Sequence, residues 1–186
     1  MFEEIRVLFG WKPAGFQAFW NHYNNGRSFI LVSFATPDFL LLKRDLAAPI
    51  PLPVWPDGVR LVRLEVTDVK AIHALLQRAY VSGFGSVEPD WLDWWEALRA
   101  DSEFDRDLCF VAKSEDEVVG FCLCWTTSFV KDLVVAPEEQ GRGIGEALLL
   151  AALLVLQARG ATGVRLKVVT ANAGARRLYA RLGFGI

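Results

Sequence analysis

Three glycines in close succession, Gly141, Gly143 and Gly145, separate an apolar, β-branched segment from a strongly apolar run. This order predicts a strand, a turn and then a helix. The backbone N–H groups of such a turn are not covered by side chains, and those at a helix start are unpaired and favour an anion. Arg142 adds a cation within the same turn. The segment is therefore suited to bind a phosphate or diphosphate group.

The glycine spacing separates the known classes of phosphate-binding turn. A P-loop requires G-x-x-x-x-G-K-[ST], but no Lys-Ser or Lys-Thr pair follows these glycines. A Rossmann fingerprint has G-x-G-x-x-G, whereas the pattern here is G-x-G-x-G. A nucleotide-binding protein therefore stays only a distant alternative.

The turn and a second segment together resemble a known family. Residues 140–145 (QGRGIG) resemble the Q/R-x-x-G-x-G/A signature of the GNAT superfamily of N-acetyltransferases, and residues 133–137 (LVVAP) resemble its L-x-V-x-P strand. Residues 172–184 (NAGARRLYARLGF) resemble the N-x-x-A-x-x-[FL]-Y-x-x-x-G-F signature of the same family. Physically this segment reads as a helix that Asn172 can cap and Gly183 can end. With two motifs in the family order, the chain is identified as a member of this superfamily.

The resemblance implies the transfer of an acetyl group from acetyl-CoA to a primary amine, by direct attack in a ternary complex. It implies that strand backbone at 133–135 pairs with the pantetheine arm and that the turn holds the diphosphate. It also implies that Tyr179 is catalytic and protonates the leaving thiolate; the alternative is an aromatic side chain packed against the sheet. The expected cofactor-binding residues are Leu133, Val134, Val135, Gln140, Gly141, Arg142, Gly143, Ile144, Gly145, Glu146, Asn172 and Tyr179.

The acceptor side is less defined by the sequence. Asp132 and Glu88 are candidates for the base that deprotonates the amine, and a solvated or capping carboxylate is the alternative for each. Segment 80–95 is expected to form the acceptor pocket, although tryptophans at helical spacing are usually core. Its aromatic residues are Tyr80, Phe84, Trp91, Trp94 and Trp95. The acceptor stays open between a small-molecule amine and a peptide amine.

The composition of the chain restricts the classes of protein to which it could belong. A net charge of −2 argues against nucleic-acid binding. The apolar run 147–156 is too short to span a membrane, and the acidic start at 1–4 is unlike a signal peptide, so a cytoplasmic protein is expected. The three cysteines (Cys109, Cys122 and Cys124) and two histidines lack zinc-site spacing, so no metal is expected and buried reduced thiols are favoured. A non-catalytic acyl-CoA-binding or scaffold module with the same fold is the main rival function.

The order of expected elements matches that of the GNAT core, so the resemblance implies an α+β fold with a mixed, mostly antiparallel sheet flanked by helices. Residues 59–186 form the acetyltransferase domain, and residues 48–58, with four prolines, form a stiff linker. Residues 1–47 form an extension with a helix at 13–25 and a β-hairpin of strands 28–34 and 39–44. We expect this hairpin to complete the sheet, either within the chain or by strand exchange in a homodimer; the alternative is that it packs elsewhere. The expected elements of the domain are strands at 59–66, 108–113, 118–125, 129–135 and 164–169, and helices at 67–81, 90–100, 145–159 and from residue 172.

Overall fold

The structure is a computed structural model that describes residues 38–81 and 83–186. The helix expected at 13–25 and the strand expected at 28–34 lie outside the described residues.

The fold is a mixed, mostly antiparallel sheet flanked by helices, as predicted, and the sheet has six strands. The strands lie in the order β1-β6-β5-β4-β3-β2, and every neighbouring pair is antiparallel except β5 and β6. Their bounds are β1 Phe39–Asp45, β2 Val59–Arg63, β3 Cys109–Ser114, β4 Glu117–Trp125, β5 Phe129–Val135 and β6 Gly163–Val169. The helices are α1 Val69–Tyr80, α2 Trp91–Ala100, α3 Ile144–Ala158 and α4 Ala173–Arg181. Predicted and observed bounds agree within one residue, except that β2 ends at Arg63 rather than at 66 and α1 begins at Val69 rather than at 67.

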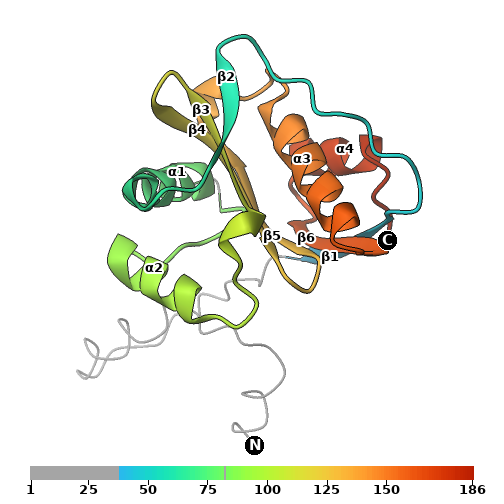
Figure 1. Ribbon diagram of the computed structural model, residues 1–186, viewed down its shortest axis with the longest axis horizontal. Coiled ribbons are helices and arrows are strands. Elements are labelled where there is room, and N and C mark those ends of the chain that lie inside the picture. The colour runs from blue at the N-terminus through green and yellow to red at the C-terminus, as the bar shows by residue number, and fades with distance from the viewer. Residues whose placement is uncertain (1–37, 82) are drawn as a thin grey trace, which may run out of the picture. The chain divides into compact units, whose positions relative to one another are not determined.

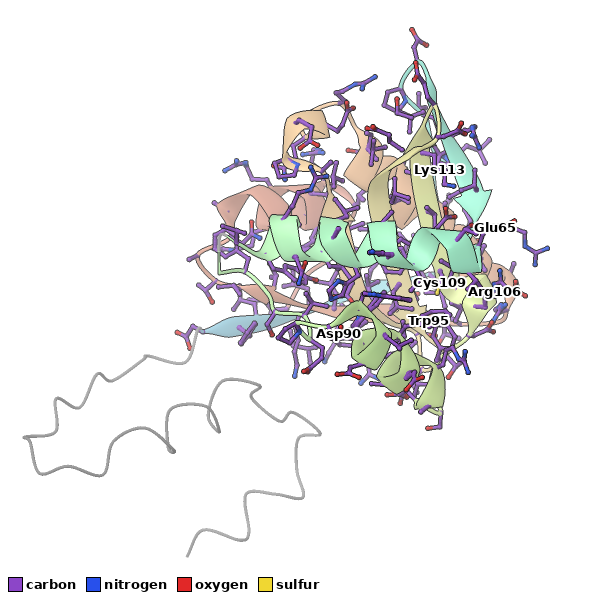
Figure 2. The ribbon with its side chains drawn as sticks, turned by 90° about the vertical axis from the view of Figure 1, so that its left-hand side faces the viewer. Glu65, Asp90, Trp95, Arg106, Cys109 and Lys113 are labelled. Atoms are coloured by element: carbon purple, nitrogen blue, oxygen red, sulfur yellow. The ribbon has the colours of Figure 1, made fainter. Side chains whose placement is uncertain are left out.

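Each face of the sheet has its own apolar core. Helices α1 and α2 cover one face, and α3 and α4 cover the other (Figure 1). The α3 face is closed by Leu148, Leu149 and Leu153, which are fully buried because this helix is apolar nearly all round. On the opposite face Trp95 lies between α1 and α2, and Asp90 stands at the start of α2 (Figure 2). The Asp90 carboxylate accepts hydrogen bonds from the N–H groups of residues 92 and 93, which caps that helix.

Cys122 and Cys124 share the α3 face of β4, and Cys109 belongs to the opposite core. All three are free and buried, which confirms the expectation of reduced thiols. None of the described helices is both long and apolar enough to cross a membrane.

Strand β1 pairs with β6 along its whole length, from Phe39 opposite Val169 to Asp45 opposite Gly163. The strand expected at 39–44 therefore pairs with the strand expected at 164–169 in the same chain. Gly185 in turn bonds to the outer edge of β1 through both backbone groups of Lys43. The domain boundaries at 47 and 58 stay predictions.

The proline-rich segment 46–58 connects the two opposite edges of the sheet. It leaves β1, passes along the α3 and α4 side, and enters β2 (Figure 1). The six strands of the sheet span about 24 Å at about 4.8 Å between neighbours. The thirteen residues of segment 46–58 reach about 40 Å when extended, so the segment is long enough to cross the sheet. Ile50 and Trp55 pack against the core on this side, and the Leu46 carbonyl accepts a hydrogen bond of 2.5 Å from Gln157. The segment is therefore attached to the domain along its path.

Candidate active site

The site is a cleft where β5 and β6 separate. These parallel strands pair only at Phe129 with Arg165 and at Val130 with Leu166. Beyond Val130 a cleft of about 1250 Å³ opens between them. Its walls are β5, β6, the turn before α3, and α4. The cleft exceeds the roughly 300–1,000 Å³ of common small-molecule sites, so a long ligand can fit.

A β-bulge in β5 accompanies this separation. On β4 the pairing advances one residue, from Leu123 to Cys124, while on β5 it advances two, from Asp132 to Val130. Lys131 is thus the extra residue of the bulge. A bulge bends its strand and increases the local twist, which is consistent with β5 leaving β6 at this point. Residues 131–135 have no pairing with β6, so one edge of β5 faces the cleft without a strand partner.

The glycine turn forms the start of α3, as predicted. Gly141 and Gly143 have φ angles of 80° and 94°, a left-handed backbone that favours glycine. Gly143 occupies the N-cap position, and no side chain caps the helix there. The first residues of α3 line the cleft, and their N–H groups have no side-chain capping acceptor, which is the arrangement that suits an anion.

The charges around the cleft favour a polyanion. Six cationic residues and two acidic residues are among those that line it. Arg142 forms an ion pair with Glu139 and donates to the Asp57 carbonyl at 3.1 Å. Arg181 pairs with Glu146 at 2.6 Å. The cationic residues are Arg78, Lys131, Arg142, Lys167, Arg177 and Arg181.

Tyr179 and Asn172 both line the cleft from α4. The Asn172 side chain accepts a hydrogen bond of 3.0 Å from the N–H of Ala175, so it caps the helix while bordering the cleft. Tyr179 is 7% exposed, and its ring lies 5.8 Å from that of Phe184. Burial, followed by the neighbouring Cys122 thiol, raises the pKa of Tyr179 well above its ordinary value. The phenol is therefore a proton donor and not an anion at neutral pH.

The strand and turn residues expected to bind the cofactor are also placed in the cleft wall. Those lining it are Leu133, Val134, Val135, Gln140, Gly141, Arg142, Gly143, Ile144, Gly145 and Glu146. The Gln140 amide donates to the Val135 carbonyl at 3.3 Å. Whether these residues hold a cofactor stays a prediction.

The acceptor side departs from the sequence expectation. Tyr80 and Phe84 line the cleft, but Trp94 and Trp95 are buried in the core between the sheet and α1 and α2. Trp91 is 36% exposed and does not line the cleft. Trp94 and Trp95 therefore follow the core interpretation that their helical spacing favours, and they do not form the alternative, a ligand wall.

The two candidate bases also differ in placement. The Glu88 backbone carbonyl accepts from His73 Nε2 at 2.7 Å, and Glu88 does not line the cleft. Asp132 is 7% exposed and accepts a hydrogen bond of 2.5 Å from the Tyr80 hydroxyl. Lys131 Nζ lies 2.7 Å from the other carboxylate oxygen. This Tyr80–Asp132 pair is the feature that sequence reasoning missed.

Comparisons with known proteins place the chain in a family. The acetyltransferase (GNAT) family profile matches residues 69–184. The chain therefore belongs to the GNAT family, which confirms the resemblance. A mycothiol acetyltransferase of Thermobispora bispora is 36% identical over 160 residues, covering 77% of this chain and 52% of the relative.

Solved structures agree with this assignment. A GCN5-related N-acetyltransferase from Sphaerobacter thermophilus is similar with a TM-score of 0.69 and 28% identity, over 80% of this chain and 48% of that one. PaiA N-acetyltransferase from Thermoplasma acidophilum, solved in complex with coenzyme A, shares the fold with a TM-score of 0.54 and 18% identity, over 69% of this chain and 90% of that one. The chain spans about half the length of the curated relatives it matches.

Proposed function

We propose that the protein transfers the acetyl group of acetyl-CoA to a primary amine, by direct attack within a ternary complex. The observation that carries the proposal is the cleft between β5 and β6, which has the uncapped start of α3 at one part of its wall and Tyr179 at another.

The residues of the cleft fit acetyl-CoA. The first N–H groups of α3, with Arg142, suit the diphosphate. The edge of β5 at 133–135 has no strand partner on the side of β6. It suits the amide groups of pantetheine, since extended backbone offers donors and acceptors at the spacing of a strand. The protonated Tyr179 would supply the proton that the leaving thiolate takes up. Acetyl-CoA itself brings the activated acyl group. Among the described residues, no cluster of three or more acidic, His or Cys side chains is placed so that it could hold a metal ion.

The names of the relatives suggest the class of acceptor. Several curated relatives are mycothiol acetyltransferases, so a mycothiol-related amine is a reasonable first acceptor to test. A peptide amine is the other class to include.

Calorimetry and a thiol-release assay test the proposal. Acetyl-CoA should bind, whereas ATP and NAD at equal concentration should not. A screen of primary amines should then find one that accelerates release of the coenzyme A thiol and yields its N-acetyl product. Binding without any amine-dependent thiol release would instead support the non-catalytic acyl-CoA-binding module.

We further propose that β1 completes the sheet within its own chain. The linker is long enough to cross the sheet, and it makes contacts with α3 and with Arg142 along the way. Exchange of β1 between two chains would make a dimer, so light scattering distinguishes the two arrangements: a monomer supports closure within the chain, and a dimer supports exchange.

A further inference from the structure

A hydrogen-bonded group of three side chains stands beside the bulge of β5. The Tyr80 hydroxyl, at the end of α1, donates to Asp132 Oδ1 at 2.5 Å, and Lys131 Nζ lies 2.7 Å from Asp132 Oδ2. Tyr80 and Lys131 line the cleft, whereas Asp132 is buried behind them. Tyr80 therefore connects the cleft to a carboxylate that a ligand in the cleft does not reach directly.

The backbone of the following loop fixes the Tyr80 ring. A Cβ atom added at Gly85 would lie 2.4 Å from Tyr80 Cε1 and 2.5 Å from Cδ1. The loop thus packs directly on the ring, and only glycine allows this approach. His73 and Gln77 of α1 hold the far end of the same loop through the carbonyls of Glu88 and Pro89, at 2.7 and 3.1 Å. The phenol is consequently held in one orientation by its own helix, the loop and Asp132.

We propose that Tyr80 and Asp132 form the proton relay that deprotonates the acceptor amine in the proposed acetyl transfer. The acceptor ammonium gives a proton to Tyr80 Oη while the Tyr80 hydroxyl proton moves to Asp132 Oδ1. The neutral nitrogen then attacks the thioester carbon. The C–N bond forms, the C–S bond breaks and its electron pair goes to sulfur, which takes a proton from Tyr179. The second nitrogen proton restores Tyr179, and the proton on Asp132 returns through Tyr80 to water.

The surroundings of Tyr80 favour a relay over a free phenolate. Burial, then the charge of Asp132 and the hydrogen bond to it, raise the pKa of Tyr80 well above its ordinary value, and Tyr179 and Cys122 contribute in the same direction. Tyr80 therefore gives up its proton only as it receives another one. The charged and titratable groups facing it are Asp132 and Lys131 of β5, Cys122 of β4 and Tyr179 of α4.

The test uses two small nucleophiles that differ in protonation. Ethanolamine is an ammonium ion near neutral pH and needs deprotonation, whereas hydroxylamine is already neutral. Tyr80→Phe removes the relay but keeps the ring and the Lys131 partner of Asp132. Gly85→Ala displaces the ring by another route. Gly185→Ala is the matched control, because no described atom beyond its two chain neighbours lies within 4 Å of its Cβ position and its φ is not positive.

We expect Tyr80→Phe and Gly85→Ala to lower enzyme-dependent transfer to ethanolamine about 100-fold or more, the scale of general base catalysis. Transfer to hydroxylamine and the acetyl-CoA dissociation constant should change less than about threefold, and Gly185→Ala should match wild type. Equal losses with both nucleophiles, or no loss with either, would overturn the relay and leave the proposed function standing. A wild type that binds acetyl-CoA but transfers to neither nucleophile, nor to any primary amine of the screen described above, would overturn both.

Discussion

Substitution of Gly145 separates ligand binding from stability. Gly145 lies in the first turn of α3, and its φ is not positive. A Cβ atom there would lie 3.4 Å from Val135 Cγ2 and 3.7 Å from Leu178 Cδ2, which are ordinary contacts with two residues of the cleft wall. Alanine therefore fits the folded protein, and it should raise the free energy of unfolding by up to about 0.5–1 kcal/mol through helix propensity.

The same methyl group should weaken acetyl-CoA binding, because it covers an N–H group of the turn. Loss of one hydrogen bond to a charged group costs about 1.5–3 kcal/mol, which corresponds to an increase of about 10- to 150-fold in Kd. Calorimetry with acetyl-CoA measures the affinity, and thermal unfolding measures the stability. The larger Gly145→Leu should weaken binding further.

Gly160→Ala is the control for a general effect of glycine removal. Gly160 has a φ of 86° beyond the end of α3, and it does not line the cleft. Alanine in this left-handed backbone costs about 1–2 kcal/mol of stability, but the Kd for acetyl-CoA should not change. The hypothesis of bare amides at the diphosphate is refuted if Gly145→Ala is folded and binds acetyl-CoA as tightly as wild type does.

Three further changes test other parts of the site and the core. Tyr179→Phe should lower kcat about 100-fold or more with an unchanged Kd for acetyl-CoA, and an unchanged kcat in this variant would remove the acid role of Tyr179. Because the pKa of Tyr179 is raised, the wild-type kcat should show no loss from ionisation of this phenol up to about pH 10. Glu139→Gln frees Arg142 from its ion pair and should tighten acetyl-CoA binding by up to about fivefold, the scale of about 1 kcal/mol for such pairs; calorimetry would show the opposite if Glu139 itself held the ligand. Burial raises the pKa of Cys109 from 9.0 to about 12, so the unfolded chain loses the thiol proton first as pH rises. The free energy of unfolding should therefore fall by about 1.4 kcal/mol per pH unit between these two values. A Cys109→Ala variant, compared with wild type by urea titration at each pH, should lack this contribution to the slope.

The parts of the site that follow from local sequence were predictable. The turn at 141–145 needs glycine for its positive φ angles, and that requirement shows in the chain itself. The α4 segment likewise begins at a capping Asn172 and ends before Gly183, whose φ is 78°. Both features depend on neighbours within a few residues, so spacing alone identifies them.

The acceptor side depends on contacts between distant segments. Tyr80 and Asp132 are 52 residues apart and meet only because α1 packs across β5. The helical spacing of the tryptophans in α2 is more often that of a core than that of a ligand wall. The packing of α2 against α1 and the sheet assigns Trp94 and Trp95 to the core.

The bulge at Lys131 explains why the direction of Asp132 could not be obtained from alternation. In a regular strand Val130, Asp132 and Val134 would share one face. In the structure Val130 belongs to the core under α3, whereas Val134 belongs to the core under α1. One extra residue exchanges the two faces of a strand, so the residues after Lys131 have the opposite orientation from those before it. The bulge thereby turns Asp132 toward Tyr80 at the point where β5 leaves β6, so the proposed relay and the unpaired edge proposed for acetyl-CoA depend on the same irregularity.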